Sequence, residues 1–199
     1  MDKGHTQRAD MNLAAQGQAT SGKILNNIAE WIVVIVIAFI VSLLIRRYVV
    51  EFYQVPTGSM IDTIEEGDYV VGEKISFYMR SPEQGDIVTF TDPVDPDTTL
   101  IKRVIATGGQ TVDLIDGSVY VDGKALLEPY TDGKESLPLS ESVAEISYPY
   151  TVPEGYIWVM GDNRSESLDS RFFGAVPVSD VMARAFWTYW PLDRFGALI

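Results

Sequence analysis

The chain opens with a polar segment and continues into a long apolar run. Residues 1–23 mix Gln, Gly, Ala, Thr and Ser with a few charges, a composition that predicts a disordered tail. Residues 31–45 read WIVVIVIAFIVSLLI, and apolar neighbours extend this run to 24–50. A bilayer-spanning helix needs roughly 20 residues. Because the run is apolar on every face, a transmembrane helix is favoured over a buried core helix.

Two further features bear on this segment. The stretch Leu43-Leu44-Ile45-Arg46 lacks the small residues that a cleavable signal peptide has at its exit, so a permanent anchor is favoured. Lys23 precedes the run, whereas Arg46 and Arg47 follow it. The positive charges that usually mark the cytoplasmic side are therefore split, and charge alone leaves the orientation of the helix open.

After the apolar run, the pattern changes to short segments rich in β-branched and aromatic residues, which are typical of strands. The predicted strands are 69–71, 86–90, 98–106, 156–160 and 181–189. Asp-Gly pairs at 116–117 and 122–123 separate short alternating runs and predict hairpin turns. Residues 128–150 are rich in Pro, Gly, Ser and acids, and predict loops. We therefore expect a mostly β, antiparallel part after the helix.

Composition narrows the possible chemistry. The 199 residues include no cysteine, which excludes disulfides, thiol nucleophiles and thiolate metal sites. The single histidine, His5, lies in the polar tail, so neither a Ser-His-Asp triad nor a histidine-rich zinc site is expected. Residues 1–50 carry five Lys/Arg and three Asp/Glu, whereas 51–199 carry ten and 25, giving +2 and −15 within the total of −13. This acidity argues against nucleic acid as a partner.

A candidate nucleophile, Ser59, lies shortly after the apolar run, in the stretch 53–60 that reads YQVPTGSM. Pro56 restricts its own backbone and that of Val55, and Gly58 allows another chain to approach closely. Ser59 is therefore presented by a constrained turn. From this stretch alone, a solvated connector remains an alternative to a nucleophile, and a nucleophilic Ser59 would need a lysine or a carboxylate as its base.

Lys102 is the candidate base, because its setting differs from that of the other five lysines. Strand alternation places Leu100, Lys102 and Val104 on one face. A lysine among apolar neighbours is desolvated, which lowers its pKa by up to ~3–5 units when burial is complete. A general base near neutral pH needs such a shift. A lysine that protects an edge strand from aggregation is the alternative reading of the same residue.

A third polar stretch, residues 161–174, reads GDNRSESLDSRFFG. A surface loop explains this composition. Read functionally, Asp169 and Arg171 could fix a loop through an ion pair, and Ser165 or Ser167 could form a hydrogen bond at a site.

Together these stretches resemble the bacterial type I signal peptidases, with four blocks in the order of that family. Residues 56–60 (PTGSM) resemble the nucleophile block, and residues 67–71 (GDYVV) the next one. Residues 85–88 (GDIV) with 101–104 (IKRV) resemble the block that bears the base, and residues 161–174 resemble the last and most specific block. The chain differs from the usual pattern by a threonine at Thr57, where serine is usual, and by Asp62, where proline is usual.

The resemblance implies a role for each matching residue. Ser59 would be the nucleophile of a Ser/Lys dyad and Lys102 its general base, oriented by Ser167. The Ser59 backbone N–H and the Thr57 hydroxyl would form the oxyanion hole. The ion pair of Asp169 and Arg171 would hold the last block in place. Candidates for shallow apolar substrate pockets are Val55, Met60, Ile64 and Leu100. No metal and no cofactor are implied.

The resemblance also implies a fold and a function. We expect two antiparallel β regions after the transmembrane helix of residues 24–50, with a catalytic core at 51–106 and 155–199 and an inserted β-hairpin and loop region at 107–154. The implied activity is removal of N-terminal signal peptides from secreted precursors by a membrane-anchored serine endopeptidase. The implied partners are these precursors, membrane lipid and the secretion translocon. The N-terminus would lie inside, and the catalytic domain on the extracytoplasmic face of the cytoplasmic membrane.

Two other functions remain as alternatives. One is another membrane-tethered Ser/Lys hydrolase, such as a relative of self-cleaving repressors. The other is a catalytically silent single-pass binding protein. Cleavage of a model precursor would separate the first from a signal peptidase, and reaction with a serine-directed acylating inhibitor would separate the second.

Overall fold

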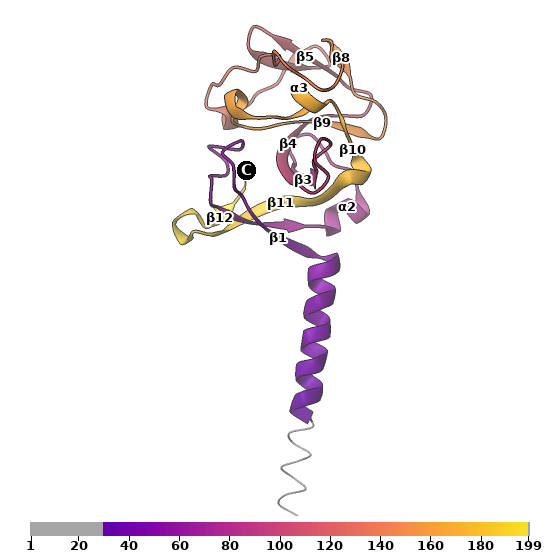
Figure 1. Cartoon of the computed structure of the whole chain (residues 1–199), viewed down its shortest axis with the longest axis vertical. Coiled ribbons are helices and arrows are strands. Elements are labelled where there is room, and N and C mark those ends of the chain that lie inside the picture. Colours follow the sequence, from indigo (N-terminus) through magenta and orange to yellow (C-terminus); the bar gives the residue numbers. More distant parts are fainter. Residues whose placement is uncertain (1–29, 199) are drawn as a thin grey trace, which may run out of the picture. The chain divides into compact units, whose positions relative to one another are not determined.

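A computed structural model describes residues 30–198 of the chain (Figure 1). Two compact units can be distinguished, Met1–Arg46 and Arg47–Ile199. The predicted tail of residues 1–23 lies outside the described residues.

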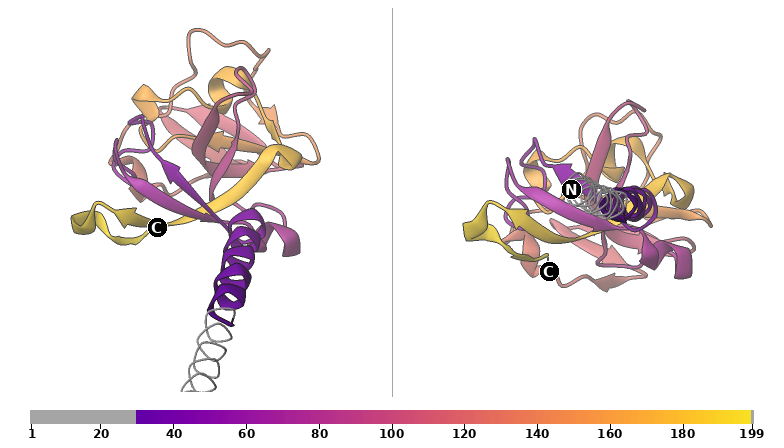
Figure 2. Two further views of the ribbon diagram at one scale, coloured as in Figure 1. Left: turned by 60° about the horizontal axis from the view of Figure 1, so that its bottom comes forward. Right: turned by 90° about the horizontal axis from the view of Figure 1, so that it is seen from below.

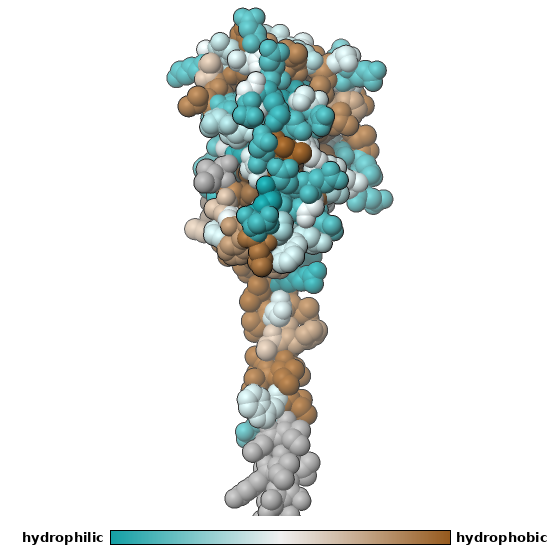
Figure 3. Space-filling view, turned by 90° about the vertical axis from the view of Figure 1, so that its left-hand side faces the viewer, coloured by the Kyte–Doolittle hydropathy of each residue, from teal (hydrophilic) through white to brown (hydrophobic). Residues whose placement is uncertain are grey.

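The described part begins with a helix of 19 residues, Glu30–Tyr48, which is long and apolar enough to cross a membrane. Its apolar side chains are exposed along the helix, and the face seen in the space-filling view is largely apolar (Figure 3). A helix with such a surface is suited to lipid rather than water, in agreement with the predicted membrane anchor. The predicted segment ran to residue 50, but the helix ends at Tyr48. The reason is that Val50 already pairs with Glu73 as the first residue of a strand.

The second unit is mostly β, as predicted. Within residues 30–198, eight strands form one sheet in the order β1-β2-β11-β3-β4-β9-β10, with β12 beside β11 (Figure 1). Every pairing in this sheet is antiparallel. Its strands are β1 (Val50–Gln54), β2 (Tyr69–Glu73), β3 (Ile87–Thr91), β4 (Thr99–Thr107), β9 (Tyr156–Met160), β10 (Val176–Pro177), β11 (Val181–Trp190) and β12 (Gly196–Ala197). The long strand β11, drawn in yellow, can be followed in two further views (Figure 2).

A smaller antiparallel sheet is built from the middle of the chain, in the order β7-β6-β5-β8. Its strands are β5 (Thr111–Ile115), β6 (Ser118–Val121), β7 (Lys124–Ala125) and β8 (Tyr150–Thr151). Both Asp-Gly pairs form the predicted turns, because Asp116, Gly117, Asp122 and Gly123 all have positive φ. Asp and Gly tolerate this conformation better than most residues. Two antiparallel sheets after an apolar helix confirm the predicted fold class.

Short helices connect the strands. They are α2 (Ile75–Met79), α3 (Ser170–Phe173) and the 3₁₀ turns η1 (Pro129–Thr131), η2 (Arg164–Glu166), η3 (Val178–Asp180) and η4 (Leu192–Arg194). α3 starts at an N-cap: the Asp169 carboxylate accepts a hydrogen bond from the Arg171 backbone N–H at 3.1 Å. This cap fixes the end of the last sequence block, next to β9.

The two sheets share a hydrophobic core. Trp158 and Met160 of β9 pack with Val112 and Val119 of the smaller sheet. These side chains are fully buried, so the smaller sheet packs against the face of β9 that carries Trp158 and Met160. β9 also pairs with β4, the strand that carries Lys102, so the core determines where that lysine lies.

Candidate active site

The candidate nucleophile lies in the connection between β1 and β2. This connection is closed at its base, where the Val55 N–H donates to Asp68 O at 2.9 Å and the Gly67 N–H donates to Val55 O at 2.8 Å. Near its middle, the Ile61 N–H donates to Gly58 O at 3.2 Å. Ser59 is buried at 7% exposure. It lies in a structured turn and not in a solvated connector.

Lys102 meets Ser59 across the fold. Its Nζ donates hydrogen bonds to Ser59 Oγ at 2.6 Å and to Ile101 O at 3.1 Å. β4 lies between β3 and β9, so Lys102 is not on an edge strand. Burial to 3% exposure lowers the pKa of Lys102 from 10.5 to about 8, although nearby carboxylates, Asp169 first among them, oppose the shift. The amine is therefore partly neutral near neutral pH.

The last sequence block, residues 161–174, is hydrogen-bonded to the turn that carries Ser59, which is called the nucleophile turn below. The Asn163 backbone N–H donates to Ser59 O at 3.1 Å, and its side-chain Nδ2 donates to Gly58 O at 2.9 Å. A Cβ on Gly161 would overlap Ser59 O and the Ser167 side chain. Only glycine therefore allows these backbones to lie so close.

Asp169 and Arg171 form a buried, bidentate ion pair. Arg171 Nε donates to Oδ1 and Nη2 to Oδ2, each at 2.9 Å, and both side chains are almost fully buried. The pair also joins other parts of the block, because the Gly161 N–H donates to Asp169 Oδ2 at 3.0 Å and Arg171 Nη2 donates to Arg164 O at 2.8 Å. A buried charge pair of this kind is expected to be costly to break.

Ser167 and Thr57 differ in their surroundings. Ser167 is buried at 5% exposure beside Gly161, and its Oγ makes no hydrogen bond within residues 30–198. The predicted contact with the Lys102 amine is thus not formed in this structure. Thr57 is exposed and lines the same cavity as Ser59 and Lys102. Its role in an oxyanion hole stays a prediction.

A cavity of about 330 Å³ opens onto the Ser/Lys pair. Apolar side chains form much of its wall, and acidic ones contribute as well. It is lined by Thr57, Ser59, Asp92, Val94, Asp95, Leu100, Lys102, Glu166, Leu168, Phe172 and Phe173. Of the four predicted pocket residues, Leu100 lines this cavity. Val55, Met60 and Ile64 instead pack together in a buried core cluster with Val70 and Ile87.

Comparison with known proteins identifies the family of the chain. The family described as "Signal peptidase, peptidase S26" matches residues 28–190. The chain belongs to this signal peptidase family. It is accordingly a membrane-anchored serine endopeptidase that cleaves signal peptides, and its substrates are precursors that carry them.

Relatives cover most of the chain. A Synechocystis sp. protein named "Probable signal peptidase I-1" is 37% identical over 86% of this chain and 87% of its own length. The Arabidopsis thaliana "Thylakoidal processing peptidase 1, chloroplastic" is 32% identical over 81% of this chain, which matches 48% of the plant protein. A signal peptidase I from Enterococcus faecalis V583, known from a crystal structure, shares 32% sequence identity with this chain. The match covers 53% of this chain and 97% of the Enterococcus chain, with a TM-score of 0.44.

Two ion pairs of the catalytic unit were not predicted from the sequence. Arg103 forms a buried bidentate ion pair with Asp162, at 2.9 and 2.7 Å. Asp62, which stands at the usual proline position, pairs with Lys134 at 3.1 Å on the surface. Arg103 directly follows the candidate base and Asp162 lies in the last block. The available signal for the Arg103–Asp162 pair was therefore the position of its members, since each lies in a block that carries a predicted site residue.

Within residues 30–198, no group of three or more His, Asp or Glu side chains is arranged to hold an ion.

Proposed function

We propose that this signal peptidase cuts its substrates by a Ser59/Lys102 dyad through an acyl-enzyme intermediate. The observation that carries the proposal is the 2.6 Å contact between Lys102 Nζ and Ser59 Oγ. This distance is within the range that a general base needs to remove the serine proton. The lowered pKa of Lys102, about 8, supports the same assignment because only a neutral amine can accept that proton.

In the first step, neutral Lys102 Nζ takes the proton of Ser59 as Oγ bonds to the carbonyl carbon of the scissile peptide. The carbonyl oxygen becomes an oxyanion, which the Ser59 backbone N–H and the Thr57 hydroxyl would stabilise. When the tetrahedral intermediate collapses, the carbon–nitrogen bond breaks. The Lys102 ammonium then gives its proton to the leaving amine, and the signal peptide stays on Ser59 as an ester.

The second half of the reaction releases the signal peptide. Lys102, neutral again, takes a proton from a water molecule that attacks the ester carbon. Collapse of the second tetrahedral intermediate breaks the bond to Ser59 Oγ, and the Lys102 ammonium returns its proton to that oxygen. Ser167 would keep the amine oriented through both steps. The Asp169–Arg171 pair would hold the last block, including Gly161, against the nucleophile turn.

The substrates would be secretory precursors cut on the extracytoplasmic face of the cytoplasmic membrane, with membrane lipid and the secretion translocon as further partners. The helix Glu30–Tyr48 supports a single-pass anchor. Ser59 follows this helix by only eleven positions, which supports a site near the membrane surface on the side of the helix C-terminus. The N-terminus would then lie inside.

The test is cleavage of a purified precursor by the full-length protein in lipid vesicles, with the product identified by mass spectrometry. We expect one cut at the end of the signal peptide, and none with Ser59→Ala. Equal cleavage by folded Ser59→Ala would refute the assignment of the nucleophile.

Topology needs its own measurement. A reporter that is active only after export, fused after Ile199, should be active in cells. Activity only of a reporter that works in the cytoplasm would place the catalytic unit on the wrong side for exported substrates.

A further inference from the structure

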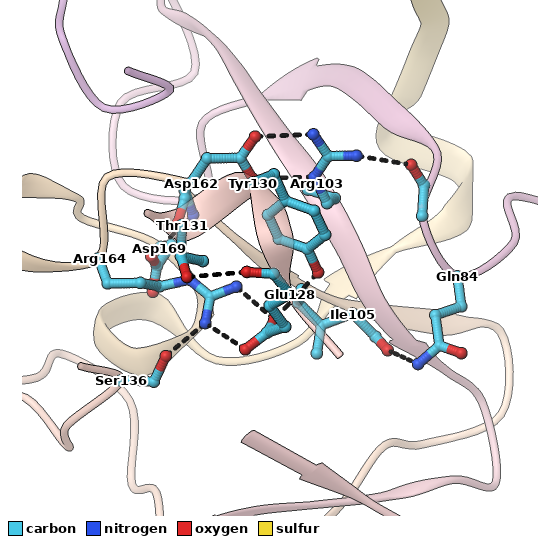
Figure 4. A network of polar contacts seen from close by, with 12 residues as sticks. Gln84, Arg103, Ile105, Glu128, Tyr130, Thr131, Ser136, Asp162, Arg164 and Asp169 are labelled. Atoms are coloured by element: carbon cyan, nitrogen blue, oxygen red, sulfur yellow. Dashed lines mark hydrogen bonds and ion pairs between the residues drawn. The ribbon is translucent and has the colours of Figure 1, made fainter. Parts of the chain in front are cut away.

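The segment between β7 and β8 of the small sheet contacts the last sequence block of the signal peptidase site through one glutamate. Glu128 precedes η1, and its carboxylate accepts two hydrogen bonds from Arg164, at 2.9 Å from Nη1 and 2.5 Å from Nη2 (Figure 4). Arg164 also contacts Ser136 Oγ through Nη1. The Arg164 side chain is fully buried and that of Glu128 is 9% exposed. The pair is thus a charged contact largely removed from solvent.

The other end of Arg164 holds the backbone behind the nucleophile. Arg164 Nε donates to Gly161 O at 2.9 Å, and its own N–H donates to Asp162 O at 3.0 Å. Residues 161 and 163 are those that touch the nucleophile turn, through the close approach to Ser59 O and the hydrogen bonds of Asn163. A continuous chain of contacts therefore runs from Glu128 through Arg164 to Ser59.

Tyr130, two residues after Glu128, adds a second link. Its hydroxyl donates to Glu128 Oε1 at 3.0 Å, and its ring lies 3.9 Å from the Arg103 guanidinium carbon. Arg103 in turn pairs with Asp162, which also accepts a hydrogen bond from Thr63 of the nucleophile connection at 2.5 Å. The segment 128–130 thus contacts both arginines that flank the site (Figure 4).

The geometry points to Glu128 as a positioning residue for catalysis: through Arg164, it keeps the backbone of residues 161–163 where it can hold the nucleophile turn. The inference rests on the proposed Ser59 mechanism. Without the carboxylate, a buried guanidinium would lose its paired charge and would move toward other acceptors. Gly161 and Asn163 would move with it. A displacement of about 1 Å at a reacting group can cost ~10²-fold in rate.

The experiment measures how fast a serine-directed acylating inhibitor, in excess, reacts with the full-length protein. The observed first-order rate constant does not depend on how much protein is folded, whereas the amplitude does. A purely structural role would therefore lower the amplitude alone. We compare the wild type with Glu128→Gln, Glu128→Asp and a control, Glu73→Gln. Glu73 also binds an arginine, since Arg184 Nε donates to it at 3.0 Å, but on β2, away from residues 161–163.

Glu128→Gln should lower the rate constant by ~10–10²-fold, Glu128→Asp should recover part of the loss because it keeps the charge, and Glu73→Gln should react like the wild type. A Glu128→Gln rate constant equal to that of the control would overturn the inference, whatever the amplitude. If Glu128→Gln gives no folded protein, Tyr130→Phe replaces it. Removing that one hydrogen bond should slow acylation by about two- to tenfold. An unchanged rate constant would then refute the inference.

The wild type and Ser59→Ala separate this inference from the mechanism beneath it. If the wild type reacts and Ser59→Ala does not, the Ser59 mechanism stands, and the Glu128 result is decided on its own. If the two react alike, both proposals fail.

Discussion

The pH dependence of cleavage follows directly from the setting of Lys102. Its pKa is lowered from 10.5 to about 8, with burial as the main cause. Because the neutral amine is the active form, activity should rise with pH and level off above the pKa. Protonation at lower pH removes the base, so kcat/KM should fall about tenfold for each pH unit well below 8.

The size of the effect can be worked out from the fraction of neutral amine. With a pKa of about 8, this fraction is about 90% at pH 9, about 9% at pH 7 and about 1% at pH 6. Activity should therefore drop about 90-fold between pH 9 and pH 6. With the ordinary pKa of 10.5, only about 3% would be neutral at pH 9, and activity would still be rising steeply there.

The assay measures kcat/KM with a soluble signal-sequence peptide from pH 5.5 to 10 at constant ionic strength, with folding followed by circular dichroism. Asp92 provides a matched perturbation. Its carboxylate is one of those that raise the pKa of Lys102, and it lines the same cavity. Asp92→Asn should therefore shift the acid limb to lower pH. Lys74→Arg, a change at a partly buried lysine that pairs with Glu51 and does not line the cavity, should leave the profile unchanged.

Two results would refute this reasoning. One is a folded enzyme whose activity is flat between pH 6 and pH 9. The other is an acid limb that moves to higher pH in Asp92→Asn, because loss of a nearby negative charge cannot favour the protonated amine.

Three further predictions follow from the site and the anchor. Thr57→Val should lower kcat by ~10²–10³-fold and Thr57→Ser only slightly, if the hydroxyl stabilises the oxyanion; wild-type kcat for Thr57→Val in steady-state assays would exclude that role. Asp169→Asn leaves the buried Arg171 charge unpaired and should reduce the free energy of unfolding, measured in urea, by about 3–5 kcal/mol. A change below about 1 kcal/mol would mean that the ion pair does not stabilise the last block. A chain shortened to begin at Arg47 keeps β1 and should cleave soluble peptides at the full-length rate but membrane-bound precursors more slowly, and loss of peptide cleavage in the folded short chain would give the helix a direct catalytic role.

Much of the fold could be predicted because local patterns specify it. Segments rich in β-branched and aromatic residues marked β4, β9 and β11 to within a residue or two, and the Asp-Gly turns marked the hairpins of the small sheet. The end of the helix was placed two residues late. Val49 and Val50 are apolar enough to continue a membrane span. Val50 instead pairs with Glu73 of the neighbouring strand β2, and the local sequence pattern does not indicate such a pairing.

The site was harder to predict for the same reason. Alternation indicated that Lys102 is desolvated, but its partner Ser59 is 43 positions away and was indicated by family resemblance. The Glu128–Arg164 pair spans 36 positions and was missed, since a glutamate in a loop-rich stretch looks like a solvated residue. The sequence likewise indicated that the apolar residues of the predicted pocket are buried, but not whether each lines the cavity or packs in the core. Leu100 lines the cavity, whereas Met60 packs in the core.

The most direct test of the account is precursor cleavage by Lys102→Arg. Arginine keeps the positive charge and much of the length of lysine but does not deprotonate at any working pH. The folded variant should therefore be as inactive as Ser59→Ala and Lys102→Ala across the whole pH series. Substantial cleavage by folded Lys102→Arg would contradict the account, because it would remove Lys102 as the base and direct the search to the carboxylates that line the cavity.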